Sequence, residues 1–227
     1  MSFADKILSF NRQLEITVPL PDSVRVLYPY QENPEVLEIA RAFYRKFYED
    51  EGKRKLILGI NPGRLGAGAT GIPFTDPKRL TAYCGIDCSF SLHEPSSEFV
   101  HEVIKAFGGV EKFFGDFYIS SVCPLGFVRL DEQGKETNFN YYDSPRLATA
   151  LEPFIVEALK EQLNFGIDSK QVFCLGTGKN YKYLEKLNQE HHLFGEVVPL
   201  EHPRYIMQYK SRSKQLYIDK YLHELCE

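Results

Sequence analysis

Four short apolar runs, separated by stretches with helical periodicity, constrain the fold of this 227-residue chain most strongly. Apolar runs of this length are typical of strands that are buried on both faces of a parallel sheet. Their alternation with helices predicts an α/β fold, a three-layer α/β/α sandwich around a four-stranded parallel sheet, which we expect to form a single domain over residues 1–227. The expected strands are 55–60, 116–122, 171–175 and 196–200, and the expected helices are 34–51, 96–107, 145–164, 179–190 and 213–225.

The loops that follow these strands indicate where a ligand binds, because ligands of open α/β sheets lie beyond the carboxyl ends of the strands. Residues 59–74 follow the first strand and hold five glycines and two prolines in sixteen positions. Glycine lacks a Cβ and lets the backbone approach a ligand closely. Residues 120–125 follow the second strand and residues 201–205 follow the fourth, so three loops converge on one edge of the predicted sheet.

Two of these loops resemble the signature motifs of uracil-DNA glycosylases. The motifs are Gly59-Ile60-Asn61-Pro62-Gly63, which continues to Thr70-Gly71-Ile72-Pro73-Phe74, and His202-Pro203. The long first motif is most similar to that of the single-strand-selective monofunctional (SMUG) branch. The resemblance implies the fold of that family and a monofunctional DNA glycosylase without a cofactor. Such an enzyme flips a damaged base out of DNA and hydrolyses its N-glycosidic bond in base excision repair. The expected substrate is DNA, single- or double-stranded, that contains uracil or a related deaminated or oxidised base.

Two residues are the candidate catalytic groups. As the N-glycosidic bond breaks, negative charge grows on the base, and His202 is placed to donate a hydrogen bond to the carbonyl where that charge develops. The resemblance gives His202 the same role. Asn61 corresponds to the residue that holds the attacking water. An amide accepts a hydrogen bond from water and fixes its direction, although it is not a strong base. The structural alternative is that Asn61 only forms the turn before Pro62.

The expected base pocket combines backbone amides with one aromatic ring. Phe74 matches the aromatic residue that stacks on the flipped base, and the loop around Ile60, Gly63 and Arg64 supplies amide donors. Family members read the base edge with an Asn two residues before Cys-Pro-Leu, whereas this chain has Ser121 there. A serine hydroxyl is shorter and discriminates less, and Asn138 or Asn140 is the alternative reader of the base edge.

The segment after His202 is expected to bind DNA and to wedge into the base stack. It departs from the His-Pro-Ser-Pro-Arg pattern of the SMUG branch, and which side chain inserts is left open. The expected DNA-binding residues are Pro203, Arg204, Tyr205, Met207 and Lys210.

Composition limits the remaining alternatives. The net charge of −4 argues against a broad basic DNA-coating surface. Five scattered cysteines, with Cys84 and Cys88 as the only close pair, lack the four-ligand spacing of a metal site, so we expect no metal and no disulfide. No apolar run is long enough for a membrane helix and no signal peptide is evident, which favours a cytoplasmic monomer. A hydrolase of free nucleosides or nucleotides and a non-catalytic nucleic-acid-binding module on the same fold remain the alternatives.

Overall fold

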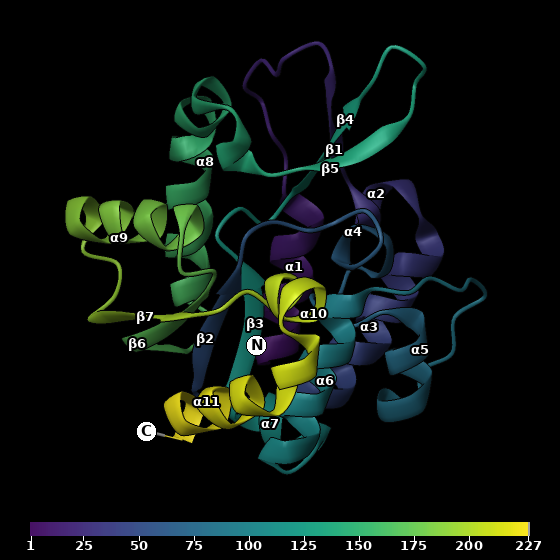
Figure 1. Ribbon diagram of the computed structural model, residues 1–227, viewed down its shortest axis with the longest axis vertical. Coiled ribbons are helices and arrows are strands. Elements are labelled where there is room, and N and C mark those ends of the chain that lie inside the picture. The colour runs from purple at the N-terminus through teal and green to yellow at the C-terminus, as the bar shows by residue number, and fades with distance from the viewer. Residues whose placement is uncertain (227) are drawn as a thin grey trace.

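A four-stranded parallel sheet lies at the centre of the protein, seen in a computed structural model that describes residues 1–226 (Figure 1). Its strands stand in the order β3-β2-β6-β7. Leu58 of β2 is paired with Ser120 of β3 and with Cys174 of β6, and Leu175 is paired with Leu200 of β7. The four carboxyl ends therefore meet at one edge, as predicted. The strand bounds are β2 Arg54–Gly59, β3 Phe117–Ser121, β6 Ile167–Leu175 and β7 Glu196–Leu200.

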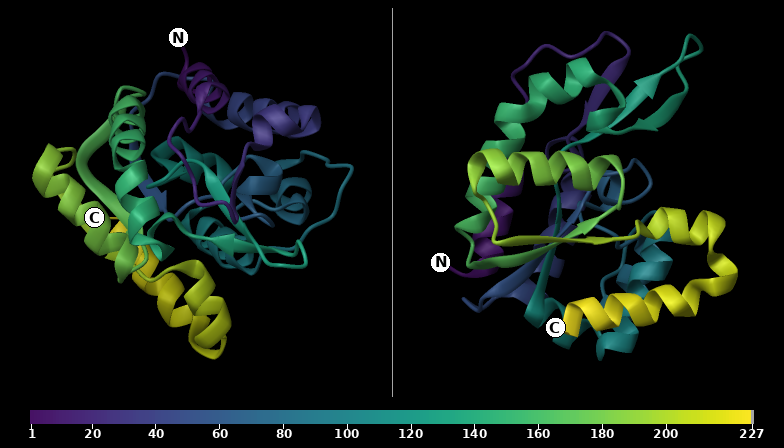
Figure 2. Two further views of the ribbon diagram at one scale, coloured as in Figure 1. Left: turned by 90° about the horizontal axis from the view of Figure 1, so that it is seen from above. Right: turned by 60° about the vertical axis from the view of Figure 1, so that its left-hand side comes forward.

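Helices cover both faces of this sheet and confirm the predicted three layers. Figure 2 (right) shows the sheet between α8 and α9 above it and α10 and α11 below it. Helix α6 lies in the same layer as α10 and α11, with which it is in contact. The bounds are α6 Pro95–Phe107, α8 Pro145–Leu163, α9 Lys179–His191, α10 Pro203–Tyr209 and α11 Lys214–Cys226.

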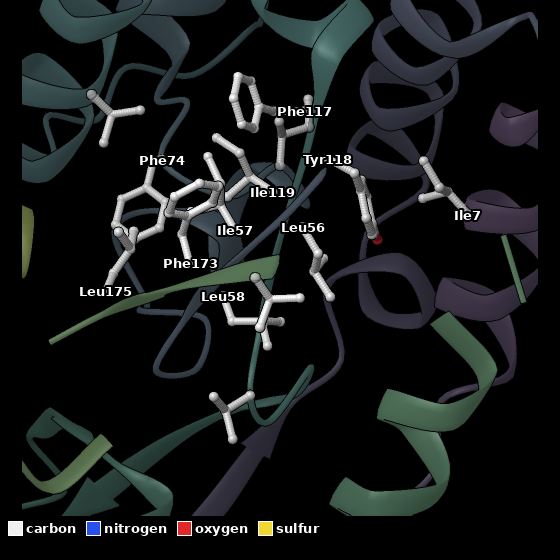
Figure 3. Packing of buried hydrophobic residues seen from close by; sticks show 14 of the residues in the cluster. Ile7, Leu56, Ile57, Leu58, Phe74, Phe117, Tyr118, Ile119, Phe173 and Leu175 are labelled. Carbon is white, nitrogen blue, oxygen red and sulfur yellow. The ribbon is translucent and has the colours of Figure 1, made fainter. Parts of the chain in front are cut away.

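The core follows from the alternation of side chains along the buried strands. In Figure 3, Leu56 and Tyr118 lie on the same side of the strands as Ile7, whereas Ile57 lies on the other side with Phe74 and Phe173. Leu56 and Phe173 are fully buried. Phe74 comes from the loop after β2 rather than from a helix, so part of the predicted ligand loop is itself a layer of the core.

The expected strands and helices leave Pro124 to Asp143 as a polar loop, and this expectation was wrong. This segment forms the strands β4 (Gly126–Leu130) and β5 (Glu136–Phe139), which join β1 (Val24–Leu27) in an antiparallel sheet of order β1-β4-β5. The polar residues between β4 and β5 were interpreted as part of a loop, but they form the turn of a hairpin. The Asp131 carboxylate accepts hydrogen bonds from the backbone N–H groups of Gln133 and Lys135 and thereby closes this turn.

The first fifty residues, in which the sequence revealed only one helix, contain two more, α1 and the short α2. Helix α1 (Phe3–Gln13) begins with a capping box between Ser2 and Asp5, and α3 (Pro34–Tyr48) ends three residues before its predicted end. The guanidinium of Arg54, at the start of β2, lies 4.8 Å from the ring centroids of both Phe3 and Tyr48. The Arg54 side chain is almost fully buried and also pairs with Asp50, so it ties α1 to the central sheet.

Short helical segments complete the chain. None of the helices within residues 1–226 is long and apolar enough to span a membrane. The remaining bounds are α2 Pro29–Glu32, α4 Ala67–Thr70, α5 Pro77–Arg79, the π-helix η1 Leu80–Cys84, α7 Val110–Asp116, and the 3₁₀ helices η2 Tyr141–Asp143 and η3 Ser211–Ser213.

Candidate active site

Asn61 lies just beyond the carboxyl end of β2, and its side-chain amide is held on both sides. Its Oδ1 accepts the backbone N–H of Tyr141 at 3.2 Å, and its Nδ2 donates to the carbonyl of Phe139 at 3.3 Å. These partners lie at the end of β5, about eighty positions further along the chain. The amide is thus fixed in one orientation. Because a carbonyl oxygen has two lone pairs, Oδ1 retains acceptor capacity for a water molecule.

A buried chain of hydrogen bonds then connects Asn61 to two other strands. The hydroxyl of Tyr141 donates to Oδ1 of Asn180 at 2.8 Å, and both side chains are almost fully buried. The Nδ2 of Asn180 in turn lies 3.4 Å from the carbonyl of Gly59 and 3.1 Å from that of Leu175. The ends of β2, β5 and β6 are therefore joined through side chains, and neither Tyr141 nor Asn180 was among the predicted site residues.

Phe74 packs beside the end of β2 because position 59 is a glycine. A Cβ at Gly59 would lie 3.1 Å from the ring of Phe74, closer than nearly all real contacts. The backbone of Phe74 has a φ of 51°, in the left-handed region that non-glycine residues rarely adopt. The ring centroid of Phe74 lies 5.9 Å from that of His202, so the two predicted motifs meet.

His202 begins α10 and caps it with its own imidazole. Its Nδ1 accepts the backbone N–H of Arg204 at 3.1 Å, which requires a lone pair on Nδ1 and places the proton of the neutral ring on Nε2. Burial of the ring, together with the nearby Arg204 guanidinium, lowers the pKa of His202 to about 4. At neutral pH, His202 is therefore an uncharged donor through Nε2.

Ser121 lies at the end of β3 as the register partner of Gly59, so it adjoins the strand end against which Phe74 packs. It is 6% exposed and borders a cavity of only about 30 Å³, together with Pro62 and Pro73 of the glycine-rich loop. This volume is close to that of a single water molecule. The predicted base reader is thus inside the site region, in a tightly packed environment.

Asn138 and Asn140, the alternative readers of the base edge, differ in position. Asn138 on β5 reaches the glycine-rich loop, where its Oδ1 accepts the backbone N–H of Arg64 at 3.0 Å. A Cβ at Gly63 would lie 3.5 Å from the Asn138 amide nitrogen. Asn140 is placed at the start of η2, where its backbone N–H donates to Asp143. Only Asn138 contacts the first motif, and it occupies one of the amides that was expected to face the base.

The segment after His202 is a helix rather than the expected loop. Pro203 is its first residue and is buried, while Arg204 and Tyr205 are exposed. Met207 is half-buried, and Lys210 is exposed at the end of the helix. Proline is favoured at the first position of a helix. Pro203 was therefore a signal in the sequence for the helix start that the structure shows. Tyr205 and Tyr209 stand together on this helix with ring centroids 5.5 Å apart, and Tyr209 was not among the predicted residues.

Two cavities flank His202 and Arg204. One, of about 260 Å³, is lined by Ile60, His202 and Tyr205 together with residues 176–180. Its wall includes the amino end of α9 and Lys179, which favour an anion, and also Glu201, whose carboxylate is paired with Lys220. The turn Gly176-Thr177-Gly178 before a helix was visible in the sequence but was not assigned to the site. The other cavity, of about 400 Å³, lies between the first motif, the start of α6 and α10.

No group of three or more His, Cys, Asp or Glu side chains within the described part of the chain is arranged to hold a metal ion.

Comparison with known proteins agrees with this geometry. The family model described as the uracil DNA glycosylase superfamily matches residues 46–226. A crystal structure of wild-type SMUG2 from Pedobacter heparinus is 54% identical in sequence and superposes with a TM-score of 0.96, covering 99% of this chain and 97% of that one. No curated protein sequence matches the chain.

Proposed function

Because the chain belongs to the uracil DNA glycosylase superfamily, we propose that it is a monofunctional DNA glycosylase that excises uracil or a related deaminated or oxidised base from DNA. The observation that carries this proposal is the pairing of a neutral imidazole donor, His202, with a rigidly held amide, Asn61, at the same sheet edge. The reaction is hydrolysis of the N-glycosidic bond, and it initiates base excision repair.

His202 supplies the electrostatic part of the reaction. As the bond breaks, electrons move onto the base, and the Nε2–H of His202 donates to the carbonyl oxygen that receives this charge. A neutral donor suits this task because it needs no proton before the reaction and holds its orientation through the Nδ1 hydrogen bond to Arg204. The preorganised donor stabilises the departing base more than the intact nucleotide, which is the requirement for catalysis.

Asn61 directs the water. With its Nδ2 and one lone pair of Oδ1 committed to the end of β5, the amide presents its second lone pair in a fixed direction. A water held there is aimed at the anomeric carbon, where positive charge develops as the base departs. Orientation alone removes part of the entropic barrier.

The base is held by stacking and by backbone donors. Phe74 is fixed against Gly59 and near His202, so a base stacked on its ring lies within reach of the imidazole. The amides of Ile60 and Gly63 supply polar contacts beside it, while that of Arg64 is bonded to Asn138. Ser121 at the end of β3 is the reader of the base edge.

Helix α10 is the proposed DNA-contacting element. The exposed residues Arg204, Tyr205 and Lys210 supply charge and aromatic surface, and Pro203 and Met207 form the apolar support. Tyr205 also borders the cavity that contains Lys179, where the amino end of α9 favours a backbone phosphate. We propose one domain, because a single hydrophobic cluster includes residues from α1 to α11, and we further propose that the protein acts as a monomer in the cytoplasm.

A cleavage assay tests the proposal. Labelled oligonucleotides that each carry one uracil, xanthine, hypoxanthine or 5-substituted uracil are incubated with the protein, and alkali then converts abasic sites to strand breaks. We expect release of uracil without a lyase break before alkali treatment. Turnover of free deoxyuridine at a rate that matches the oligonucleotide would instead indicate a nucleoside hydrolase. DNA binding without release of any base would indicate a binding module.

A further inference from the structure

The 400 Å³ cavity contains a carboxyl group that neither proposed catalytic residue uses. The carboxyl belongs to Glu94, directly before α6, and it lies against Gly66 of the first motif, where a Cβ would be only 2.5 Å from its oxygens. Position 66 therefore has to be glycine for Glu94 to occupy this place. The backbone N–H of Glu94 donates to Asp76 at 3.0 Å, and Asp76 is itself paired with Arg79, so the residue is firmly anchored.

One oxygen of this carboxyl lacks a partner. Oε2 of Glu94 is buried without a hydrogen bond to any group of the described residues. A buried oxygen without a donor is costly, and a ligand that brings N–H groups removes that cost. The terminal torsion of a glutamate is broad, so rotation presents either oxygen to the cavity.

The surroundings of Glu94 select against an anionic ligand. Burial raises the pKa of the Glu94 carboxyl to about 7, and the fully buried carboxylate of Asp76 nearby adds to this increase. The Arg204 guanidinium acts in the opposite direction. His93, 3.7 Å from Asp76, is the remaining titratable group that lines the cavity. A phosphate would meet the Glu94 carboxyl here, with the Asp76 carboxylate close to it, whereas a neutral group with N–H donors would satisfy Glu94.

The cavity walls combine apolar and polar surface, as a nucleobase requires. Leu65, Pro95 and Met207 contribute apolar surface, and the amides of Asn138 and Gln208 contribute polar groups. The volume falls within the range of small-molecule sites. Gly63 and Arg204 also line the cavity, each two residues from a proposed catalytic residue, so it adjoins the site where the excised base is held.

We propose that this cavity is a second nucleobase subsite, which takes an unstacked base of the DNA and reads its N–H edge with the Glu94 carboxyl. The inference rests on the proposed glycosylase function, which supplies a distorted DNA next to the cavity. Among the DNA bases, guanine alone presents two adjacent N–H donors, N1–H and N2–H₂, on its Watson–Crick edge, and two donors match the two oxygens of the ionised Glu94 carboxyl. The subsite therefore prefers guanine.

Guanine reaches the cavity from one of two sources, which the experiment separates. It is either a neighbour of the damaged nucleotide on the same strand or the base opposite it in a duplex. The probes are oligonucleotides with one uracil, in which guanine or hypoxanthine stands at the 5′ neighbour, the 3′ neighbour or the opposite position. Hypoxanthine keeps N1–H but lacks the 2-amino group, so each pair of probes differs by one donor.

Single-turnover rates and dissociation constants are measured for the wild-type protein and for Glu94→Gln. We expect the single-turnover rate or the affinity to be about five- to hundredfold higher with guanine than with hypoxanthine at one of the three positions. That position identifies the source of the bound base. Glu94→Gln should abolish this ratio, because its carboxamide replaces one acceptor with a donor. Glu102→Gln is the control. It alters a carboxylate of α6 that is bonded to Lys214 of α11 and lies outside the cavity, so this variant should retain the ratio.

Two outcomes would overturn the subsite. One is a guanine-to-hypoxanthine ratio within twofold at all three positions. The other is a Glu94→Gln variant that changes every substrate by the same factor, which would mean that Glu94 only holds Arg204 or the loop. Melting curves of both variants exclude unfolding as the cause. If the wild-type protein releases no uracil from any probe, the proposed function fails, and the dissociation constants still decide whether Glu94 reads guanine.

Discussion

The side-chain oxygen of Asn61 accepts a hydrogen bond from the backbone N–H of Tyr141, across eighty positions of sequence. The contact joins the first motif to η2, which directly follows a hairpin that the sequence did not reveal. It fixes the orientation of the Asn61 amide for the reaction, and it also stabilises the fold. The first effect is measured by the rate of base release and the second by the stability of the protein.

Asn61→Ala should slow base release under single-turnover conditions by about a hundredfold, because the water loses its orienting acceptor. The hydrogen bonds to Tyr141 and Phe139 are also lost, so some loss of stability is expected. The rate is measured at a temperature where circular dichroism shows the variant to be folded. A variant that is folded and retains the wild-type rate would remove Asn61 from the reaction.

His202→Ala should lower excision by about two to three orders of magnitude, the effect of one lost oxyanion donor. The affinity for DNA should change little, because the imidazole donates mainly as the bond breaks. His191→Ala, which alters an exposed histidine at the end of α9, is the matched control. Activity of His202→Ala within about threefold of the wild type would contradict the assigned role.

The pH dependence of excision should reflect the low pKa of His202, about 4. Protonation would place a hydrogen on Nδ1, opposite the Arg204 N–H, and break the cap. The neutral form dominates above the pKa, so the His202 contribution to the rate should stay constant from about pH 5.5 to 8 and fall only as the pH approaches 4. A profile of single-turnover rates that declines with a midpoint near 6.5 would show that His202 titrates as an ordinary histidine.

Ser121→Asn should sharpen the preference for uracil over xanthine by about fivefold, the effect of one additional fixed hydrogen bond. The wild-type serine has one rotatable proton and limited reach, so we expect it to accept uracil, 5-substituted uracils and xanthine. The adjacent cavity of about 30 Å³ is the space into which the larger side chain has to fit. The measurement is the ratio of single-turnover rates on matched oligonucleotides, and an unchanged ratio would transfer the reading role to another residue such as Asn138.

Glu94→Gln should stabilise the folded protein at high pH. The pKa of Glu94 is raised to about 7 when folded, so the folded state binds the proton more tightly than the unfolded state. The free energy of unfolding of the wild type therefore falls as the pH rises from about 4.5 to 7, and glutamine removes this loss. We expect a gain of about 1–3 kcal/mol at pH 8 and almost none at about pH 4, below the unfolded pKa, measured by denaturant titration. An equal change at both pH values would mean that the carboxyl does not titrate in this window.

The sequence predicted the central sheet and the two motifs because their signals are local. Buried strands are continuous apolar runs, and the motif residues Asn61 and His202 follow them directly. The hairpin β4–β5 was missed because its outward residues are polar and its pairing with β1 spans a hundred positions. Glu94 carries no local signal at all, since its burial depends on its contact with Gly66, which is distant in sequence.

The buried series of hydrogen bonds from Asn61 through Tyr141 and Asn180 to Gly59 means that the two motifs cannot form the site without the rest of this fold. Transplanting residues 59–74 and the His202-Pro203 pair onto another parallel sheet would carry over the chemical groups but leave the Asn61 amide without the strand end that orients it. An active site of this kind is inherited with its scaffold. A designer who wished to move it would have to copy the β4–β5 hairpin, Tyr141 and Asn180 of α9 as well as the two motifs.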